Sequence, residues 1–254
     1  MFYYSGELGL AIENKLRILM KDHDVGGHGI NHMIAVANHA TKALEHENIP
    51  QCDKIRIELA ALLHDADDEK IFPGNKNYEN ARKILDEVLT DEYLQLSDHK
   101  EQYREYFINK IIEMIGLVSC SKNGDSEPPL KWMAVPRDSD RLEAIGQIGI
   151  DRCREFSASV NALSHCTDTP RVHTMEELWA VATPERLANY KVIKKSRSMI
   201  DHYYDKLLHV GKPECLRSQN PYILIEAAKR NNLMAQFVLD YWSQEQPKTK
   251  YVQL

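Results

Sequence analysis

Histidine and aspartate side chains occur in three segments of the sequence that could bring them into one cavity. His28 and His32 follow a pair of glycines and lie four residues apart, which places both on one side of a predicted helix. His64 and Asp65 are adjacent at the end of an apolar run, and Asp140 precedes another long apolar helix face. A lone His-Asp pair usually belongs to a solvated surface, so the inference depends on all three segments together.

His32 and His64, together with Asp65 and Asp140, form a mixed nitrogen and oxygen ligand set. Such a set suits one divalent Mn, Mg, Fe, Co, Ni or Zn ion and leaves positions open for water and substrate. A metal ion held in this way lowers the pKa of water and polarises a phosphoryl oxygen. The pattern therefore predicts metal-assisted hydrolysis.

The elements that must position these side chains are helices, because apolar residues recur at spacings of three and four through most of the chain. The sequence shows no strand-like alternation of useful length, no internal repeat and no low-complexity segment. The predicted helices cover about 6–22, 30–47, 53–66, 77–89, 100–118, 139–163, 184–209 and 221–245.

Three breaks interrupt this pattern. A Pro-Gly turn lies at 72–75, a loop rich in Ser, Gly and Pro covers 119–136, and an irregular stretch runs from about 165 to 174. None of them has the length and composition of a flexible interdomain linker. We therefore expect one all-α domain over residues 1–254.

The composition excludes several classes of protein. The chain has 254 residues and a formal net charge of −6, which argues against a nucleic-acid polymer as partner. No apolar run approaches the length of a membrane span, and no secretion signal opens the chain. The five cysteines are scattered without a CxxC pair, which is typical of reduced thiols. We expect a cytoplasmic protein.

Four segments resemble the HD superfamily of metal-dependent phosphohydrolases, whose ligands follow the order H…HD…D. The segments are GHGINH at 27–32, LLHDADDEK at 62–70, PRDSDRLEAIGQIGIDRC at 136–153 and IDHYYDKLL at 200–208. They are similar to those of a branch of small, single-domain HD hydrolases. The resemblance covers about 26–210, leaves a C-terminal helical extension at about 211–246, and implies a compact HD-domain helical bundle.

The resemblance implies a role for each candidate metal ligand. His32 resembles the first ligand, and His64 with Asp65 resembles the pair that names the family. Asp140 resembles the last ligand. Asp138 is close enough to be confused with it, but the Asp-Arg-Leu step that matches the family begins at Asp140.

Further residues could act on the substrate. Asp68 lies four residues after His64 and could serve as general base beside Asp65, although it could equally be an exposed acid. His39 lies seven residues after His32 on roughly the same predicted helix face, and we assign it no functional role. Phosphate contacts are predicted for His28, Lys70, Arg141 and Arg152. His28 could instead be a structural residue at a helix start, and Arg141 could pair with a neighbouring acid.

The spacing favours a single metal ion. Some HD relatives hold two metals with two extra histidines between the HD pair and the last aspartate. Between Asp65 and Asp140 this chain has only His99. The two-metal arrangement cannot be completed there, which argues against a di-iron oxygenase and against the two-metal cyclic-nucleotide phosphodiesterases.

The sequence thus predicts an enzyme that hydrolyses a phosphate ester or phosphoanhydride of a small nucleotide-like substrate. It would be a nucleotidase or a nucleotide pyrophosphohydrolase, and close relatives suggest cleavage at a terminal phosphate or release of pyrophosphate. The alternatives are a non-catalytic metal or nucleotide sensor with the same fold, and a metal-dependent oxygenase. We expect a small phosphorylated substrate, no membrane partner, and a homodimer as a possible assembly.

Overall fold

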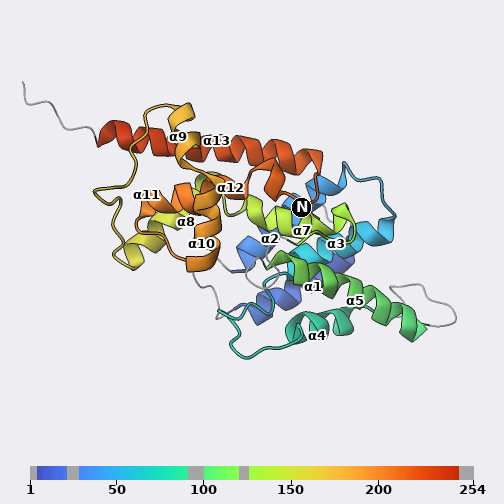
Figure 1. Cartoon of the computed structure of the whole chain (residues 1–254). Helices are drawn as coiled ribbons and strands as arrows, with labels where there is room; N and C mark the ends of the chain where they lie inside the picture. The colour runs from blue at the N-terminus through green and yellow to red at the C-terminus, as the bar shows by residue number, and fades with distance from the viewer. Residues whose placement is uncertain (1–4, 22–28, 91–99, 120–125, 246–254) are drawn as a thin grey trace, which may run out of the picture. The chain divides into compact units, whose positions relative to one another are not determined.

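The computed structural model describes residues 5–21, 29–90, 100–119 and 126–245. These ranges are helical and contain no strand, which confirms the predicted all-α class (Figure 1). The chain divides into two compact units, one made of Met1–Glu143 with Pro213–Glu226 and the other of Ala144–Lys212 with Ala227–Leu254. That the whole chain acts as one domain stays a prediction.

The first unit contains the segments that carry all the candidate metal ligands. Its helices are α1 (Glu7–Leu19), α2 (Ile30–Leu44), α3 (Gln51–Leu63), α4 (Glu79–Val88), α5 (Lys100–Val118), η1 (Lys131–Ala134), α7 (Val135–Leu142), η3 (Pro213–Cys215) and the start of α13 (Pro221–Gln244).

The second unit contains shorter helices and most of α13. They are α8 (Gly146–Ser159), α9 (Met175–Val181), α10 (Pro184–Ile193), α11 (Met199–His202), the π-helical turn η2 (Tyr203–Leu207) and α12 (Leu208–Val210). Here η2 packs against α10, α11 and α12.

Helix α3 is the centre of the first unit. All residues from Arg56 to Leu63 are buried, and the helix packs against α1, α2, α5 and α7. A helix that is buried on every side belongs to the interior of a domain. The HD pair follows directly at its C-terminal end, so these two side chains start from a rigid support.

A buried carboxylate ties three helices of this unit together. Glu58 on α3 has no exposed surface. Its carboxylate accepts hydrogen bonds from the backbone N–H (2.7 Å) and hydroxyl (2.5 Å) of Ser5, which precedes α1, and from the hydroxyl of Thr41 on α2 (2.6 Å). Buried charges are tolerated where hydrogen bonds of this kind satisfy them. Glu58 therefore fixes α1 and α2 on the central helix.

Two of the predicted helices are divided in the structure. The prediction of one helix over 139–163 was wrong, because α7 ends at Leu142 and α8 begins at Gly146. Gly146 has a φ of 75°, and a Cβ added there would lie 2.9 Å from Cγ of Arg230. Such a backbone conformation favours glycine. The break separates the helix that carries Asp140 from the one that follows.

The predicted helix over 184–209 is divided in the same way. Helix α10 ends at Ile193, since Lys194 adopts a left-handed conformation with a φ of 54°. A new helix begins after Ser198, whose hydroxyl caps it by accepting the N–H of Asp201. The remaining predicted helices exist with ends shifted by a few residues. Helix η1 lies in the predicted loop at 119–136, and α9 follows the irregular stretch at 165–174, where no element was predicted.

Among the described residues, no helix combines the length and the hydropathy that a membrane crossing requires.

Replacing Glu58 by alanine is expected to lower the free energy of unfolding by about 3 kcal/mol, because buried donors on Ser5 and Thr41 lose a charged acceptor. Urea unfolding followed by circular dichroism measures this loss. Glu101→Ala removes an exposed glutamate on α5 and should change stability by less than about 0.5 kcal/mol. An equal effect of the two substitutions would contradict the role given to Glu58.

Candidate metal centre

Three helix ends present the four candidate ligands. His32 lies in the first turn of α2, His64 caps the C-terminus of α3 with Asp65 directly after it, and Asp140 lies in the last turn of α7. Helices α2, α3 and α7 pack against one another within the first unit (Figure 1). The C-terminal ends of α3 and α7 also carry partial negative charge, which favours a cation.

Helix α7 forms where the sequence supplies suitable terminal residues. Pro136 stands in the first turn, where its missing N–H has no cost. Asp138 in the first turn and Arg141 in the last turn both complement the helix dipole. The helix is short, and Asp140 is therefore placed close to its end.

The nitrogen and oxygen atoms of the four side chains converge. Nε2 of His32 lies 3.1 Å from Oδ1 of Asp140 and 3.7 Å from Oδ2 of Asp65. Nε2 of His64 lies 3.4 Å from the same Asp65 oxygen and 3.8 Å from the same Asp140 oxygen. The two Nε2 atoms are 3.3 Å apart. Both histidine nitrogens thus face both carboxylates, and the ligand atoms of His32, His64 and Asp65 all lie within 4.8 Å of one another.

The ring of His64 is oriented by the backbone. Its Nδ1 donates a hydrogen bond to the carbonyl oxygen of Ala61 at 2.8 Å, which leaves Nε2 as the atom that faces the cluster. This arrangement is the usual one for a metal-binding histidine, whose other nitrogen is held by a carbonyl or carboxylate. The rings of His32 and His64 meet edge to face, with centroids 5.1 Å apart.

The electrostatics of the cluster favour positive charge. Burial alone would lower the pKa of His64, but the carboxylates of Asp65 and Asp140 outweigh it and raise this pKa to about 9. Burial would raise the pKa of Asp140, yet the hydrogen bond from His32 and the charges of both histidines hold it below its usual value. A divalent cation would take the place of the protons that the cluster attracts.

The distances fit a single ion. Ligand atoms that bind one ion at about 2.1 Å in adjacent positions are about 3.0–3.4 Å apart. The separations of 3.1–3.8 Å are only slightly wider. His32, His64 and Asp65 are each 8–9% exposed, so the cluster is nearly closed from solvent on their side. The donor set and its spacing therefore suit one divalent metal.

The neighbouring aspartate faces elsewhere. Asp138 is fully buried, and its carboxylate accepts a hydrogen bond from the backbone N–H of Ser218 at 2.7 Å. Burial raises its pKa despite that hydrogen bond. Of the two aspartates on α7, it is Asp140 whose carboxylate meets His32 and His64.

The predicted base lies on the turn after the HD pair. Asp68 is half-buried, its N–H bonds to the carbonyl oxygen of Asp65 at 3.1 Å, and its Oδ1 accepts the N–H of Lys70 at 2.8 Å. The side chain of Lys70 is exposed. Both roles stay predictions, but Asp68 shares a single turn with a candidate ligand.

The remaining predicted phosphate contacts fall in different parts of the chain. Arg141 is 6% exposed, and its guanidinium donates to the carbonyl oxygen of Cys215. Arg152 is half-buried on α8, in the second unit. His28 and His99 lie outside the described residues. Within the first unit, both candidate histidine ligands face both candidate aspartates, whereas the guanidinium of Arg141 is directed to a backbone carbonyl.

Two features near the cluster were not predicted as functional. His39 bonds to Glu143 at 3.0 Å and to the hydroxyl of Tyr222 at 2.7 Å, so it is a hydrogen-bonded link between α2 and the end of α7. The sequence offered two signals for this link. His39 lies seven residues after His32, and Glu143 lies three residues after Asp140. The same two helices meet at the ligands and again at this buried link.

Asp67 anchors helix α4 to the turn that carries the HD pair. Its Oδ1 accepts the N–H of Asn80 (2.8 Å) and the side-chain amide of Asn75 (3.0 Å), and its Oδ2 accepts the N–H of Ala81 (2.9 Å). The N–H groups in the first turn of a helix otherwise lack partners. The sequence does not distinguish Asp67 from the other acidic residues of this turn. The structure does, because Asp67 is only 9% exposed.

Comparison with known proteins gives the following relationships. The family model described as HD domain matches residues 29–145, which include all four candidate ligands. The chain is 48% identical over 229 residues to Uncharacterized protein L803 of Acanthamoeba polyphaga mimivirus, covering 90% of this chain and 94% of that protein.

Solved structures show the same fold. An HD-superfamily hydrolase from Bacillus thuringiensis has a TM-score of 0.61 at 20% identity, covering 94% of this chain and 97% of that one. Bacillus subtilis YpgQ in complex with ADP has a TM-score of 0.56 at 18% identity, covering 95% and 96%.

Mn²⁺ is expected to stabilise the wild-type chain because it binds the folded cluster. At a free concentration of about 100 times its Kd the melting temperature should rise by about 5–10 °C. Asp140→Ala should abolish most of this shift, whereas Asp151→Ala, which removes an exposed aspartate on α8, should leave it intact. Differential scanning fluorimetry with and without EDTA measures both. A full shift in the Asp140 variant would refute the ligand set.

Asp67→Ala is expected to lower the free energy of unfolding by about 2 kcal/mol, because two helix N–H groups and one amide lose their acceptor. Asp67→Asn should lose less, since its amide oxygen can still accept. Lys83→Ala, on the exposed side of α4, is the control for urea unfolding. A loss no larger than that of the control would show that Asp67 does not anchor α4.

Proposed function

The chain belongs to the HD-domain family, and from this premise we propose that it is a metal-dependent phosphohydrolase acting on a small nucleotide-like substrate. The bond cut would be a phosphate ester or a phosphoanhydride. The observation that carries the proposal is the convergence of two imidazoles and two carboxylates at the ends of α2, α3 and α7, where each imidazole nitrogen lies 3.1–3.8 Å from an oxygen of each carboxylate.

His32, His64, Asp65 and Asp140 would hold one divalent ion. When bound, such an ion supplies Lewis acidity toward a phosphoryl oxygen and toward water. The hydrogen bond from Nδ1 of His64 to Ala61 keeps the imidazole in the required orientation. The burial of the histidines excludes water from behind the cluster and strengthens its electrostatic interactions.

Asp68 is the proposed general base. The N–H of Lys70 holds one carboxylate oxygen, and the other makes no hydrogen bond with any described residue, so it can accept a proton from water. The bond between its N–H and the carbonyl of Asp65 keeps the two carboxylates on one turn. A base positioned in this way contributes about 10²–10⁴-fold to the rate.

The nucleotide-like substrate is inferred from the candidate phosphate-binding residues and from the similarity in fold to a solved structure. Hydrolysis of a phosphate needs cations that stabilise the negative charge on the phosphoryl oxygens in the transition state. We propose Lys70, Arg141 and Arg152 for this role, as well as His28. The complex of Bacillus subtilis YpgQ with ADP supports a nucleotide as the class of substrate, because that protein has the same fold.

We expect phosphate or pyrophosphate release from at least one nucleoside mono-, di- or triphosphate in the presence of Mn, Mg, Co or Ni. Malachite-green and coupled pyrophosphate assays identify the product and hence the bond that is cut. Asp65→Ala should abolish turnover. Asp68→Asn should lower kcat by about 10²–10⁴-fold while the metal-induced shift in melting temperature remains.

Asp151→Ala is the matched control and should keep full activity. If the wild-type chain binds metal yet releases nothing from the nucleotide panel or from a generic aryl phosphate, the hydrolase proposal fails. The chain would then be better described as a metal or nucleotide sensor.

A further inference from the structure

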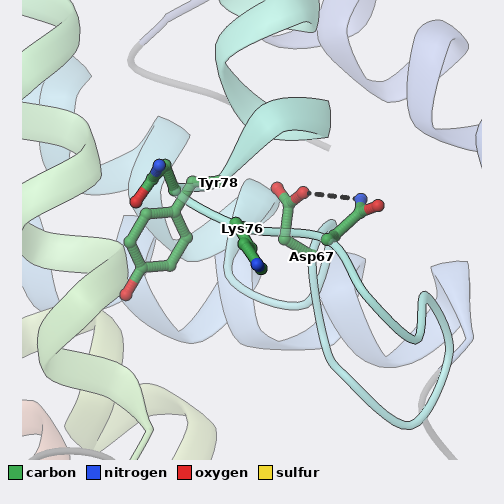
Figure 2. Close-up of a pocket in the computed structure, with 5 residues that line it drawn as sticks. Asp67, Lys76 and Tyr78 are labelled. Atoms are coloured by element: carbon green, nitrogen blue, oxygen red, sulfur yellow. Dashed lines mark hydrogen bonds between the residues drawn. The ribbon is translucent and has the colours of Figure 1, made fainter.

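The turn that carries Asp65 is anchored to α4. Figure 2 shows the carboxylate of Asp67 beside the loop that precedes this helix, and the dashed line is its hydrogen bond with Asn75. The same carboxylate accepts two N–H groups from the first turn of α4. These contacts fix the turn on α4. The spacing between α2, which carries His32, and α7, which carries Asp140, must therefore be fixed by other contacts.

A segment late in the chain returns to these two ligand helices. Pro213–Glu226, here called the return segment, contains η3 and the start of α13 and belongs to the first unit. In the sequence it is separated from α7 by Ala144–Lys212, which belong to the second unit. The return segment contains none of the four candidate ligands, yet its polar groups contact both α2 and α7.

The contacts with α7 lie on either side of Asp140 in the sequence. The backbone N–H of Ser218 donates to the carboxylate of Asp138 at 2.7 Å. The guanidinium of Arg141 donates to the carbonyl oxygen of Cys215. Ser218, Asp138 and Arg141 are all buried, and the loss of a buried hydrogen bond to a charged group is strongly destabilising. The return segment therefore holds the part of α7 that presents Asp140.

Asn220 joins the same segment to the C-terminal end of α2. It is 1% exposed, and its side-chain amide donates to the carbonyl oxygen of Ala43 (2.9 Å) and to the carboxylate of Glu47 (2.7 Å). Its Oδ1 accepts the N–H groups of Tyr222 (3.0 Å) and Ile223 (3.3 Å) and so caps the start of α13. One buried side chain thus fixes the start of α13 on α2.

Tyr222 completes a chain of hydrogen bonds across three elements. Its hydroxyl lies 2.7 Å from Nδ1 of His39 on α2. Nε2 of His39 lies 3.0 Å from the carboxylate of Glu143, directly after α7. An ionised carboxylate only accepts hydrogen bonds, so Nε2 is the donor. Because both ring nitrogens have partners, the imidazole is held in one orientation and fixes the end of α7 against α2.

This link bears on the geometry that ion binding requires. His39 lies seven residues after His32, about 10 Å along α2, and Glu143 lies three residues after Asp140. The two helices are therefore joined at two separate points, once at the ligands and once at the link. A slide of α7 by one residue would move Asp140 by about 1.5 Å, whereas metal–ligand distances tolerate only about 0.2 Å.

We propose that the return segment sets the affinity of the metal centre by fixing Asp140 against His32, with Tyr222 as the positioning residue. Tyr222 acts through His39, which in turn holds Glu143 at the end of α7. The inference rests on the proposed function only in that the four candidate ligands hold a divalent ion. It goes beyond that function, because a late segment without any ligand becomes a determinant of ion binding.

Mn²⁺ alone is the probe, and isothermal titration calorimetry of the metal-free full chain gives its Kd without turnover. Tyr222→Phe removes only the hydroxyl and should weaken Mn²⁺ binding by about 2–30-fold, the range for substitutions that act on a distant site. Loss of one neutral hydrogen bond should lower the melting temperature of the metal-free chain by only about 2–4 °C. The Kd is therefore measured on folded protein. Tyr103→Phe, at an exposed tyrosine on α5, is the matched control and should bind as the wild type does.

Glu143→Ala tests the other end of the link and should weaken Mn²⁺ binding within the same range. Glu143→Gln should recover part of the affinity, because its amide oxygen can still accept from His39. Since Tyr222 and Glu143 act through one imidazole, the double variant should weaken binding by less than the product of the two single factors. If these residues only stabilised the fold, the Kd of the folded chain would not change.

The outcomes separate this inference from the proposed function. If Mn²⁺ binding depends on Asp140 but Tyr222→Phe and Glu143→Ala bind as the control does, the positioning role is overturned and the metal centre stands. If both variants weaken Mn²⁺ binding and the wild type hydrolyses nothing, the positioning role stands and the hydrolase proposal falls. Absence of Mn²⁺ binding to the wild-type chain overturns both.

Discussion

At the ends of α2, α3 and α7, each of two imidazole nitrogens lies 3.1–3.8 Å from an oxygen of each of two carboxylates, and the two nitrogens are 3.3 Å apart. Groups so close and so little exposed repel or attract strongly, since the surrounding protein screens them less than water does. The carboxylates raise the pKa of His64 to about 9 despite its burial, which shows how strongly this volume attracts positive charge. The rest of the first unit serves to keep these four groups in place.

The supports act at successive distances from the cluster. The carbonyl of Ala61 orients His64 directly. Farther along α2 and α7, the bond between His39 and Glu143 joins the same helices a second time. Glu58 fixes α1 and α2 on the central helix. Each of these contacts is buried and polar, so it specifies one arrangement of helices where apolar packing alone would allow sliding.

The acidic residues of the turn from Asp65 to Lys70 make different contacts. Asp65 faces the histidines, Asp67 anchors α4, and Asp68 keeps one carboxylate oxygen free. This division lets an acidic run lie beside the candidate metal centre without simple mutual repulsion.

The sequence by itself determined the helical class and the order of the histidine and aspartate segments, because periodicity and motif order are local properties of the chain. It preferred Asp140 to Asp138 only by resemblance, and it missed the breaks at Gly146 and Lys194. The tertiary structure decided which carboxylate on α7 meets the histidines and which acid of the turn is buried. Those outcomes depend on partners such as Ser218 and Ala81, and helix packing alone brings such partners together.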